Sequence, residues 1–270
     1  LLGVWFTIAR ALTYKQPFVP IAIFKDATFV AASALGILIA AVLFAAVTLV
    51  PLLTQNVLGM SVVQAGILSA PRGVGTIIST LIAGRLVARV GERPMMLVGI
   101  AVFIVNFWNM GHFTLDTSQS DIAMAGLVQG LGSGLVFLPL ATMAFNTLAR
   151  ELRADATAFG NLARNLGASA GISLMLAMQT NGAVGARANL TMPYSADNPI
   201  MQWLPPPYSL SDPTGIAILS SAIDRQAAML GYTQAFQTIA VMSIFMIPLV
   251  LLLKPAAATT ARRSEPVVIE

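Results

Sequence analysis

The chain of 270 residues is 57% hydrophobic and 10% charged, with a mean hydropathy of +0.80, whereas soluble domains carry about 25% charged residues. Its net charge of +4 does not indicate nucleic-acid binding, because the basic residues are spread along the chain and are not gathered on one face with aromatic residues. The lack of Cys excludes disulfides and thiolate metal sites, and a single His leaves no cluster for zinc, so no metal or cofactor is expected.

The first 28 residues precede the main apolar runs. Residues 1–9 are apolar and no basic segment comes before them, so they are not a typical signal peptide. We expect residues 1–12 to be the tail of a truncated preceding transmembrane helix, and the chain to be the C-terminal part of a longer protein. Pro17 and Pro20 would break a long helix, and residues 13–28 are predicted to be a cytoplasmic, interfacial linker.

Six later runs are each long and apolar enough to cross a bilayer, which takes about 20 residues. They are Phe29–Leu53, Val62–Gly84, Met95–Leu115, Ile122–Leu148, Ala156–Gln179 and Thr233–Leu253. The sequence therefore predicts an all-α membrane protein with a six-helix bundle over residues 29–254. Residues 180–232 are expected to form a periplasmic loop, in which Ile216, Leu219, Ile223 and Leu230 recur at helical spacing and extend the last helix outward. Residues 255–270 are expected to be a disordered cytoplasmic tail.

Basic residues lie in the polar gaps on alternate sides of these runs. Eleven of the fifteen Lys and Arg are in gaps that six crossings would place on one face, namely Arg10, Lys15, Lys25, Arg85, Arg89, Arg93, Arg150, Arg153, Lys254, Arg262 and Arg263. The other gaps hold only Arg187 and Arg225. Because Lys and Arg stay on the cytoplasmic side, this pattern predicts a cytoplasmic C-terminus and contact with anionic lipid.

Two arginines lie inside apolar runs, where a charge should face a cavity or a partner. Arg72 follows Pro71, and it either contacts a substrate or an ion or has a structural or gating role, such as hydrogen bonding to carbonyls freed by the proline. Asn161, Arg164 and Asn165 share one helical face, as gating residues or as an interhelical hydrogen-bond cluster. Both arginines begin Arg-x-x-Gly at similar depth in the second helix of a triplet, which indicates an inverted three-plus-three repeat.

Glycines recur at a spacing of four residues in two runs. They are Gly126, Gly130 and Gly134 in the fourth run and Gly167 and Gly171 in the fifth. Small residues at this spacing allow helices to approach closely. The pattern predicts either tight helix packing or a helix that bends during function.

Amides, aromatic rings and methionines are mixed in the third and fourth runs, as in pockets that accept bulky apolar compounds. The candidate residues of a substrate pathway are Gln55, Phe103, Asn106, Phe107, Met110, Gln129, Phe137 and Met143. Ordinary core packing is the alternative for each of them.

The acidic residues lie outside the centres of the apolar runs. All eleven Asp and Glu lie in gaps or at helix ends, although a proton-driven pump normally needs an intramembrane acid. Any acid that couples transport to protons is therefore expected outside these residues. The sequence has neither a GxxxxGK[ST] nucleotide loop nor an acid–base pair within the runs, so it does not indicate an enzyme.

Several blocks follow one another in a recognisable order. Gln-Pro at 16–17 precedes Phe-Lys-Asp-Ala-Thr-Phe at 24–29, and Pro-Leu-Leu-Thr-Gln-Asn-Val-Leu-Gly at 51–59 precedes Ala-Pro-Arg-Gly at 70–73. The cytoplasmic loop motif at 84–93 contains Gly84, Arg85, Arg89, Gly91 and Arg93, and Pro-Leu-Ala-Thr at 139–142 and Asn-Leu-Ala-Arg-Asn-Leu-Gly at 161–167 follow. Together they resemble the C-terminal half of a major facilitator superfamily transporter, of the EmrB/QacA-type fourteen-helix drug:proton antiporter family.

This resemblance implies the second bundle of a proton-coupled multidrug exporter that expels hydrophobic or amphipathic toxic compounds across a bacterial inner membrane by alternating access. Its partners would be the lipid bilayer, the small-molecule substrates, protons and, in Gram-negative relatives, a periplasmic adaptor protein and an outer-membrane channel. Ala88 stands where the family's loop motif has Asp, so gating through that Asp is not implied. A facilitator for a specific metabolite, lipid or siderophore and a non-transporting membrane scaffold or sensor are the alternatives.

Overall fold

The computed structural model describes residues 23–24, 26–146, 152–192 and 213–253. The expected truncated helix, most of the linker, the irregular part of the outer loop and the cytoplasmic tail lie outside these residues.

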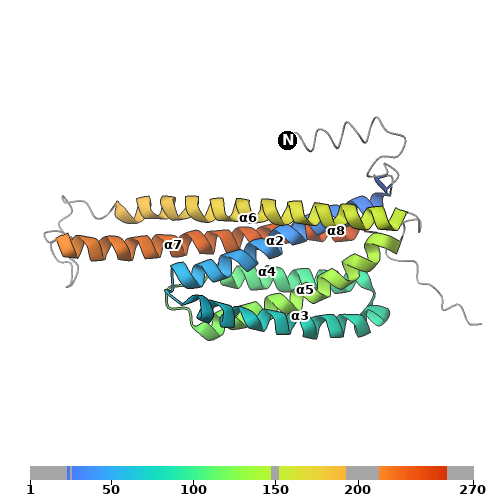
Figure 1. Cartoon of the computed structure of the whole chain (residues 1–270), viewed down its shortest axis with the longest axis horizontal. Helices are drawn as coiled ribbons and strands as arrows, with labels where there is room; N and C mark the ends of the chain where they lie inside the picture. The colour runs from blue at the N-terminus through green and yellow to red at the C-terminus, as the bar shows by residue number, and fades with distance from the viewer. Residues whose placement is uncertain (1–22, 25, 147–151, 193–212, 254–270) are drawn as a thin grey trace, which may run out of the picture.

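Seven helices account for nearly all of the described residues. They are α2 (Ala27–Asn56), α3 (Val62–Val90), α4 (Glu92–Met110), α5 (Gln119–Asn146), α6 (Arg153–Thr191), α7 (Pro213–Ile244) and α8 (Met246–Leu252). The expected all-α bundle is therefore confirmed. Successive helices from α2 to α7 run in opposite directions, and α8 continues α7 in nearly the same direction (Figure 1).

Five of the expected crossings are long and apolar enough to span a membrane. They are α2, α3, α4, the Gln119–Met143 part of α5, and the segment Pro213–Leu252, which consists of α7 and α8 together. The fifth run forms a helix as expected, but α6 does not meet this criterion. Polar residues such as Asn161, Arg164 and Asn165 reduce its hydropathy. The helix nevertheless packs lengthwise against both α2 and α7.

Local sequence explains where several helices begin. The Asp26 carboxylate accepts hydrogen bonds from the backbone N–H groups of Thr28 and Phe29 at the start of α2. Ser61 and Gln64 form a reciprocal capping box at the start of α3. These side chains satisfy backbone donors that have no partner within the helix.

The third and sixth runs end or break earlier than predicted. The third run was expected to reach Leu115, but α4 ends at Met110, before a turn that begins at Gly111. The sixth run is interrupted at Phe245, where α7 gives way to α8. Pro248 accounts for this break, because its ring clashes with the carbonyl four residues earlier, at Ile244.

The segment expected to be an outer loop is helical at both ends. α6 continues to Thr191 and α7 begins at Pro213, which confirms the helical spacing noted around Leu219. The 39 residues of α6 are about 58 Å long at 1.5 Å per residue, nearly twice the roughly 30 Å hydrocarbon core. The two helices consequently project together beyond α2–α5 (Figure 1).

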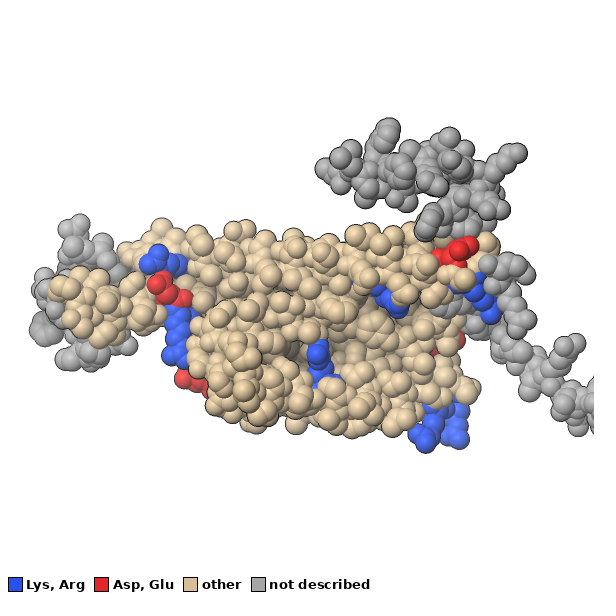
Figure 2. All heavy atoms as spheres, viewed as in Figure 1, with Lys and Arg blue, Asp and Glu red and all other residues tan. Residues whose placement is uncertain are grey.

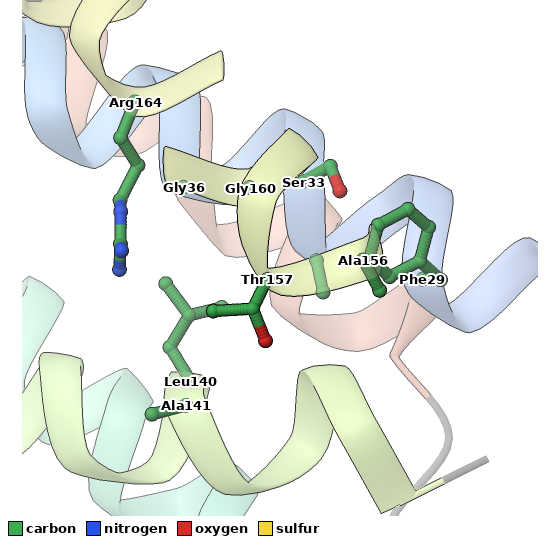
Figure 3. A pocket seen from close by; sticks show the side chains of 10 residues that line it. Phe29, Ser33, Gly36, Leu140, Ala141, Ala156, Thr157, Gly160 and Arg164 are labelled. Carbon is green, nitrogen blue, oxygen red and sulfur yellow. The ribbon is translucent and has the colours of Figure 1, made fainter. Parts of the chain in front are cut away.

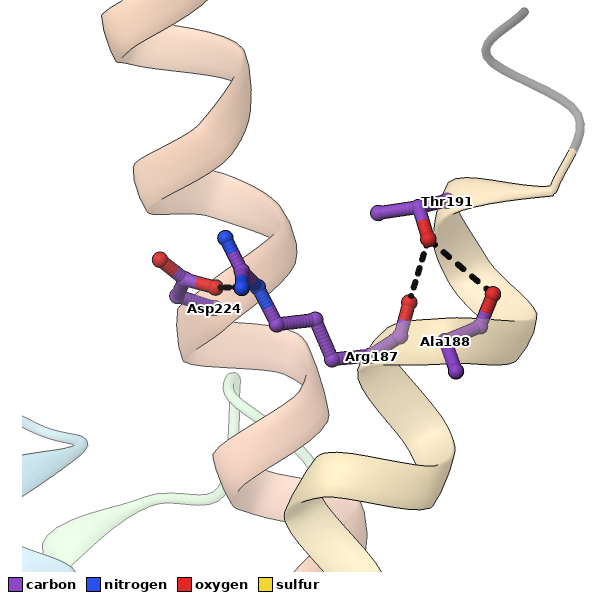
Figure 4. Close-up of polar contacts among 4 residues, drawn as sticks. All are labelled: Arg187, Ala188, Thr191 and Asp224. Atoms are coloured by element: carbon purple, nitrogen blue, oxygen red, sulfur yellow. Dashed lines mark hydrogen bonds and ion pairs between the residues drawn. The ribbon is translucent and has the colours of Figure 1, made fainter.

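The projecting pair is joined by polar contacts. Arg187 of α6 forms an ion pair with Asp224 of α7, with Nε and Oδ1 2.5 Å apart (Figure 4). Within α6 itself, Thr191 donates to the carbonyls of Arg187 and Ala188. Arg225 of α7 donates to the carbonyl oxygen of Val57, just after α2, over 2.7 Å. The hairpin is thus attached to the end of the bundle.

The hydrophobic core lies between α2, α4, α5, α7 and α8. Its largest fully buried side chains include Leu35 and Ile39 of α2, Phe103 and Phe107 of α4, and Phe236 of α7. α3 contributes little to this core, since Ile67, Ile77 and many of its other large apolar side chains are exposed. Such a surface requires lipid or another protein segment to cover it.

Charged residues gather at the two ends of the bundle and are sparse between them (Figure 2). Because the helices alternate in direction, the end of α3, the start of α6 and the end of α8 lie at one end of the bundle. Among the described basic residues, Arg85, Arg89, Arg93 and Arg153 belong to that end, and Arg187 and Arg225 belong to the opposite one. This arrangement has the alternation that the sequence predicts.

Candidate functional site

Two cavities open beside α2 and α5, and each contains one of the two arginines found inside apolar runs. The first, here called the Arg72 cavity, has a volume of about 540 Å³ and lies between α2, α3 and α5. The second, the Arg164 cavity, has a volume of about 170 Å³ and lies between α2, α5 and α6. Only the first falls within the 300–1,000 Å³ range common for small-molecule sites.

The Arg72 cavity lies near the middle of its three helices. Arg72 is ten residues after Val62, where α3 begins, which is about 15 Å along the helix and half the thickness of a hydrocarbon core. The cavity is lined by Leu43, Phe44 and Val47 of α2, Arg72, Gly73, Thr76 and Ile77 of α3, and Gln129, Ser133 and Phe137 of α5. Its walls are mainly apolar, and its polar groups come from α3 and α5.

A polar seam joins α3 to α5 at the edge of this cavity. The hydroxyl oxygens of Thr76 and Ser133 are 3.0 Å apart. Thr76 also donates to the Arg72 carbonyl over 3.0 Å, and Ser133 donates to the Gly130 carbonyl over 2.7 Å. Buried Ser79 adds a contact of 3.2 Å to the same Gly130 carbonyl. These hydroxyl groups are therefore engaged in holding the two helices together.

Two donors at the cavity remain without a partner among the described residues. Gln129 is 2% exposed, and its Nε2 forms no hydrogen bond. The half-buried Arg72 guanidinium has no ion-pair or hydrogen-bond partner in the parts of the chain that the structure describes. A buried donor without a partner costs free energy, so both groups are suited to binding an acceptor that enters the cavity.

The Arg164 cavity is smaller and has one charged group. Its lining residues are Phe29, Ala32, Ser33 and Gly36 of α2, Leu140 and Ala141 of α5, and Ala156, Thr157, Gly160 and Arg164 of α6. The Arg164 side chain extends from α6 toward α5 (Figure 3). Arg164 donates to the Asn161 side chain one turn earlier on α6, and Asn161 and Asn165 are exposed. The bond that Arg164 makes is thus within one helix, whereas the sequence left an interhelical cluster open.

The two arginines have matched surroundings. A Cβ atom on Gly126 of α5 would lie 3.8 Å from Arg72 Cβ, and a Cβ atom on Gly36 of α2 would lie 3.7 Å from Arg164 Cγ. Each arginine thus lies beside a glycine on the first helix of the other triplet. Such reciprocal contacts between the two triplets are expected of an inverted repeat, in which α2–α4 correspond to α5–α8.

Four of the five predicted packing glycines lie where two helices are in near contact. A Cβ atom on Gly130 would be 2.1 Å from the Arg72 carbonyl oxygen, and one on Gly134 would be 2.0 Å from Ser79 Oγ. On the other pair of helices, Gly167 would meet the Ile37 carbonyl oxygen at 2.4 Å and Gly171 would meet Ala41 Cα at 2.4 Å. Gly126 differs, since its nearest neighbours would be 3.8 Å away. α5 is thus pressed against α3, and α6 against α2.

The predicted pathway residues divide into two groups. Gln129 and Phe137 line the Arg72 cavity. Phe103, Phe107, Met110 and Met143 are buried in the core instead, and buried Asn106 donates to Met110 Sδ over 3.7 Å. Gln55 is half-buried near the end of α2 and does not line either cavity. Phe103, Asn106, Phe107 and Met110 of the third run are therefore packed in the core, which was the alternative to a role in the substrate pathway.

The motif predicted to be a cytoplasmic loop is mostly helical. Gly84, Arg85 and Arg89 belong to the last turns of α3, which continues to Val90 because no residue before Gly91 breaks it. Gly91 alone connects α3 to α4, with a φ of 88° that L side chains rarely adopt. Arg93 Nη2 donates to the Leu251 carbonyl over 3.3 Å and so joins α4 to α8.

Sequence reasoning missed Thr76 and Phe44 as parts of the Arg72 cavity. Thr76 is four residues after Arg72, so it lies on the same face of α3, and this spacing could have identified it. Phe44 had no such signal, because it is one apolar residue among many in α2.

Comparison with known proteins agrees with this geometry. The sequence profile of the Major Facilitator Superfamily matches residues 6–172. The chain belongs to this superfamily. Membership of this superfamily indicates a transporter rather than an enzyme, and the long apolar helices fit a multi-pass membrane protein.

Three relatives within the superfamily are similar to this chain. The Multidrug export protein EmrB of Haemophilus influenzae is 28% identical over 229 residues, which cover 83% of this chain and 45% of the relative. The Fatty acid resistance protein FarB of Neisseria gonorrhoeae is 25% identical over 254 residues, covering 92% of this chain and 50% of the relative. The Multidrug transporter protein MdtP of Bacillus subtilis is 31% identical over 144 residues, or 53% and 26% of the two chains. The chain spans half or less of the length of these relatives.

Proposed function

We propose that this chain is the C-terminal half of a proton-coupled multidrug exporter of the bacterial inner membrane. The transporter would expel hydrophobic or amphipathic toxic compounds by alternating access, with the six-helix bundle rocking against a preceding bundle. Similarity to exporters of the EmrB type, which extends over most of the chain, supports this function. The observation that carries it is the Arg72 cavity, a largely apolar space at mid-bundle with unpartnered donors at its edge.

The cavity supports a transport role better than a scaffold role. A charged residue within a membrane span is costly, and it is retained mainly where it contacts a substrate, an ion or a water-filled path. Arg72 meets this condition, since it lines a space large enough for a drug-sized compound. A scaffold would have no need for an unpartnered guanidinium group at this depth.

In this proposal the two arginines have different roles. Arg72, Gln129 and Phe137 would face the substrate, whereas Arg164 and Asn161 would belong to a gate nearer the start of α2, where the cavity is narrower. Close contacts at Gly130 and Gly167 would let α3 with α5, and α6 with α2, move as paired units. The same pairing supports the inverted three-plus-three repeat.

Proton coupling would require an acid that does not line either cavity. The described carboxylates lie at helix ends, in connections, or, for Asp224, in the projecting part of α7. The coupling acid is therefore expected in the preceding bundle. Orientation follows from the positive-inside pattern, with the Arg85–Arg93 end in the cytoplasm and the projecting α6–α7 hairpin in the periplasm. The hairpin is the surface that we propose for a periplasmic adaptor protein, which would lead to an outer-membrane channel.

Transport by the complete protein in everted membrane vesicles tests this function. An anionic and an uncharged fluorescent compound should accumulate in vesicles energised by a proton gradient, and nigericin should abolish accumulation by collapsing the pH gradient. Vesicles that contain Phe137→Ala should accumulate less of both compounds at equal protein levels. Folded, membrane-inserted protein that transports neither compound under a proton gradient would contradict the proposal.

A further inference from the structure

We propose that the Arg72 cavity selects amphipathic compounds with a single carboxylate, and that Arg72 and Gln129 together bind this anionic group. This inference rests on the proposed export function and specifies the class of substrate. It depends on three observations: the donors that remain free, the charge of the cavity and its apolar walls.

Two hydrogen-bond donors at the cavity remain free. The Thr76 and Ser133 hydroxyls already donate to the Arg72 and Gly130 carbonyls, so their protons are engaged in the seam between α3 and α5. The Arg72 guanidinium and the buried Gln129 Nε2 have no acceptor within the described part of the chain. A ligand that satisfies both must supply acceptor oxygens. A carboxylate does so, because its two oxygens match the planar fork of an arginine and can accept a further N–H bond.

The charge of the cavity also favours an anionic ligand. Arg72 is the one charged residue among those that line it. Among the described carboxylates, Asp26, Glu92 and Asp121 lie at the starts of α2, α4 and α5 and do not line the cavity. An organic cation would enter beside an uncompensated positive charge in a medium of low dielectric, where like charges interact strongly. A monoanion would neutralise that charge and would relieve the cost of holding it within the membrane.

The apolar walls define the rest of the ligand. Phe44 and Val47 of α2, Ile77 of α3 and Phe137 of α5 are among the apolar residues that line the cavity. Phe44 is 50% exposed and Ile77 is 63% exposed, so an incoming apolar tail would cover them. At about 540 Å³, the cavity has room for a fused aromatic ring system or a folded alkyl chain together with its head group.

A matched pair of fluorescent compounds tests this assignment. 4-(1-Pyrenyl)butanoate and 4-(1-pyrenyl)butyltrimethylammonium have the same aromatic tail and opposite head-group charges. Binding is measured by fluorescence anisotropy with the complete protein in phosphatidylcholine nanodiscs, and the signal from empty nanodiscs is subtracted. Zwitterionic lipid is chosen because an anionic surface would itself attract the cation.

Wild-type protein should bind the butanoate at least about tenfold more tightly than the ammonium compound, as expected for one charge-assisted hydrogen-bonded pair. Arg72→Gln should abolish this preference, whereas Arg72→Lys should retain most of it because the charge is kept. Gln129→Leu should weaken butanoate binding roughly threefold to tenfold and leave ammonium binding unchanged. Thr80→Ala, at an exposed position of α3 outside the cavity, is the bystander control and should bind both compounds as wild type does.

If Arg72→Gln does not yield folded protein, Gln129→Glu provides the same test. A carboxylate at this position would neutralise Arg72 from inside the cavity, so the preference should shift from the butanoate toward the ammonium compound. Equal or tighter wild-type binding of the ammonium compound would overturn the assignment. Butanoate binding unchanged in both Arg72→Gln and Gln129→Glu would overturn it as well.

Efflux of the same two compounds from cells separates this inference from the proposed function. Cells that export the ammonium compound and not the butanoate would keep the export function and overturn the carboxylate assignment. Cells that export neither compound would count against the export function, while Arg72-dependent butanoate binding in nanodiscs would still support the carboxylate site.

Discussion

The contact between α3 and α5 gives the sharpest prediction about the bundle itself. A Cβ atom on Gly130 would lie 2.1 Å from the Arg72 carbonyl oxygen and 2.8 Å from the Thr76 backbone nitrogen, and real Cβ atoms essentially never come within 3.0 Å of such neighbours. Both neighbours are backbone atoms of α3, so a rotamer change cannot relieve the clash. The helices would have to separate by roughly 1 Å, and a gap of that size forfeits a quarter to a half of each van der Waals contact along the seam.

We therefore expect Gly130→Ala to destabilise the protein by about 1–3 kcal/mol, as overpacking does in other cores. Gly126→Ala is the matched control, four residues earlier on α5, where the added methyl group would find its nearest neighbours at 3.8 Å. It should leave stability unchanged or raise it by up to ~1 kcal/mol, because Ala is the better helix former. The two changes are chemically identical, so the difference between them isolates the close approach.

Thermal unfolding of the complete protein in detergent, followed by intrinsic tryptophan fluorescence, measures this difference. Gly130→Ala should melt at a clearly lower temperature than both the wild type and Gly126→Ala. Equal melting temperatures for the two variants would refute the close packing of α3 against α5, and with it the geometry of the Arg72 cavity.

Three further predictions concern residues outside that seam. Asn106→Leu should leave export unchanged and alter stability by no more than about 1 kcal/mol, because Asn106 donates only to a methionine sulfur in the core; a large loss of export at normal protein levels would instead place Asn106 in the pathway. Gly91→Ala should destabilise by about 1–3 kcal/mol, since its backbone angles of φ 88° and ψ 163° belong to a region that is essentially restricted to glycine, and an unchanged thermal melt would argue against this turn. Asp224→Asn should lower stability by less than about 1 kcal/mol, because the Arg187–Asp224 pair is about half exposed; a drop of several kcal/mol on chemical unfolding would show that the ion pair is critical for the hairpin.

The sequence predicted the framework of the bundle more fully than its internal contacts. Long apolar runs and their polar boundaries located the helices, and the spacing of Gly130, Gly134, Gly167 and Gly171 identified faces where helices meet. It could not identify the opposing helix, because a glycine row specifies a close approach without specifying a partner. That α5 meets α3, and α6 meets α2, emerges only from the three-dimensional arrangement.

The sequence also identified the candidate site only in part. Arg72 and Gln129 stood out because polar groups within an apolar run require an explanation, and both line the same cavity. Phe103 and Phe107 were equally reasonable pathway residues, but they are buried in the core. In a membrane protein the lipid, the core and a drug-binding cavity are all apolar, so hydropathy cannot distinguish the faces of such a helix. The length of α6 was underestimated because its outer half is too polar to be recognised as a span.

The direction in which the chain crosses the membrane can be measured directly, since the 270 residues contain no Cys and single cysteines can be introduced one at a time. In the complete protein with any other cysteines replaced, Ala88→Cys, Thr117→Cys and Lys254→Cys would be exposed to a membrane-impermeant maleimide in spheroplasts and in everted vesicles. Position 117 should react in spheroplasts, and positions 88 and 254 should react only in everted vesicles. Labelling of positions 88 and 254 from opposite faces would contradict this orientation.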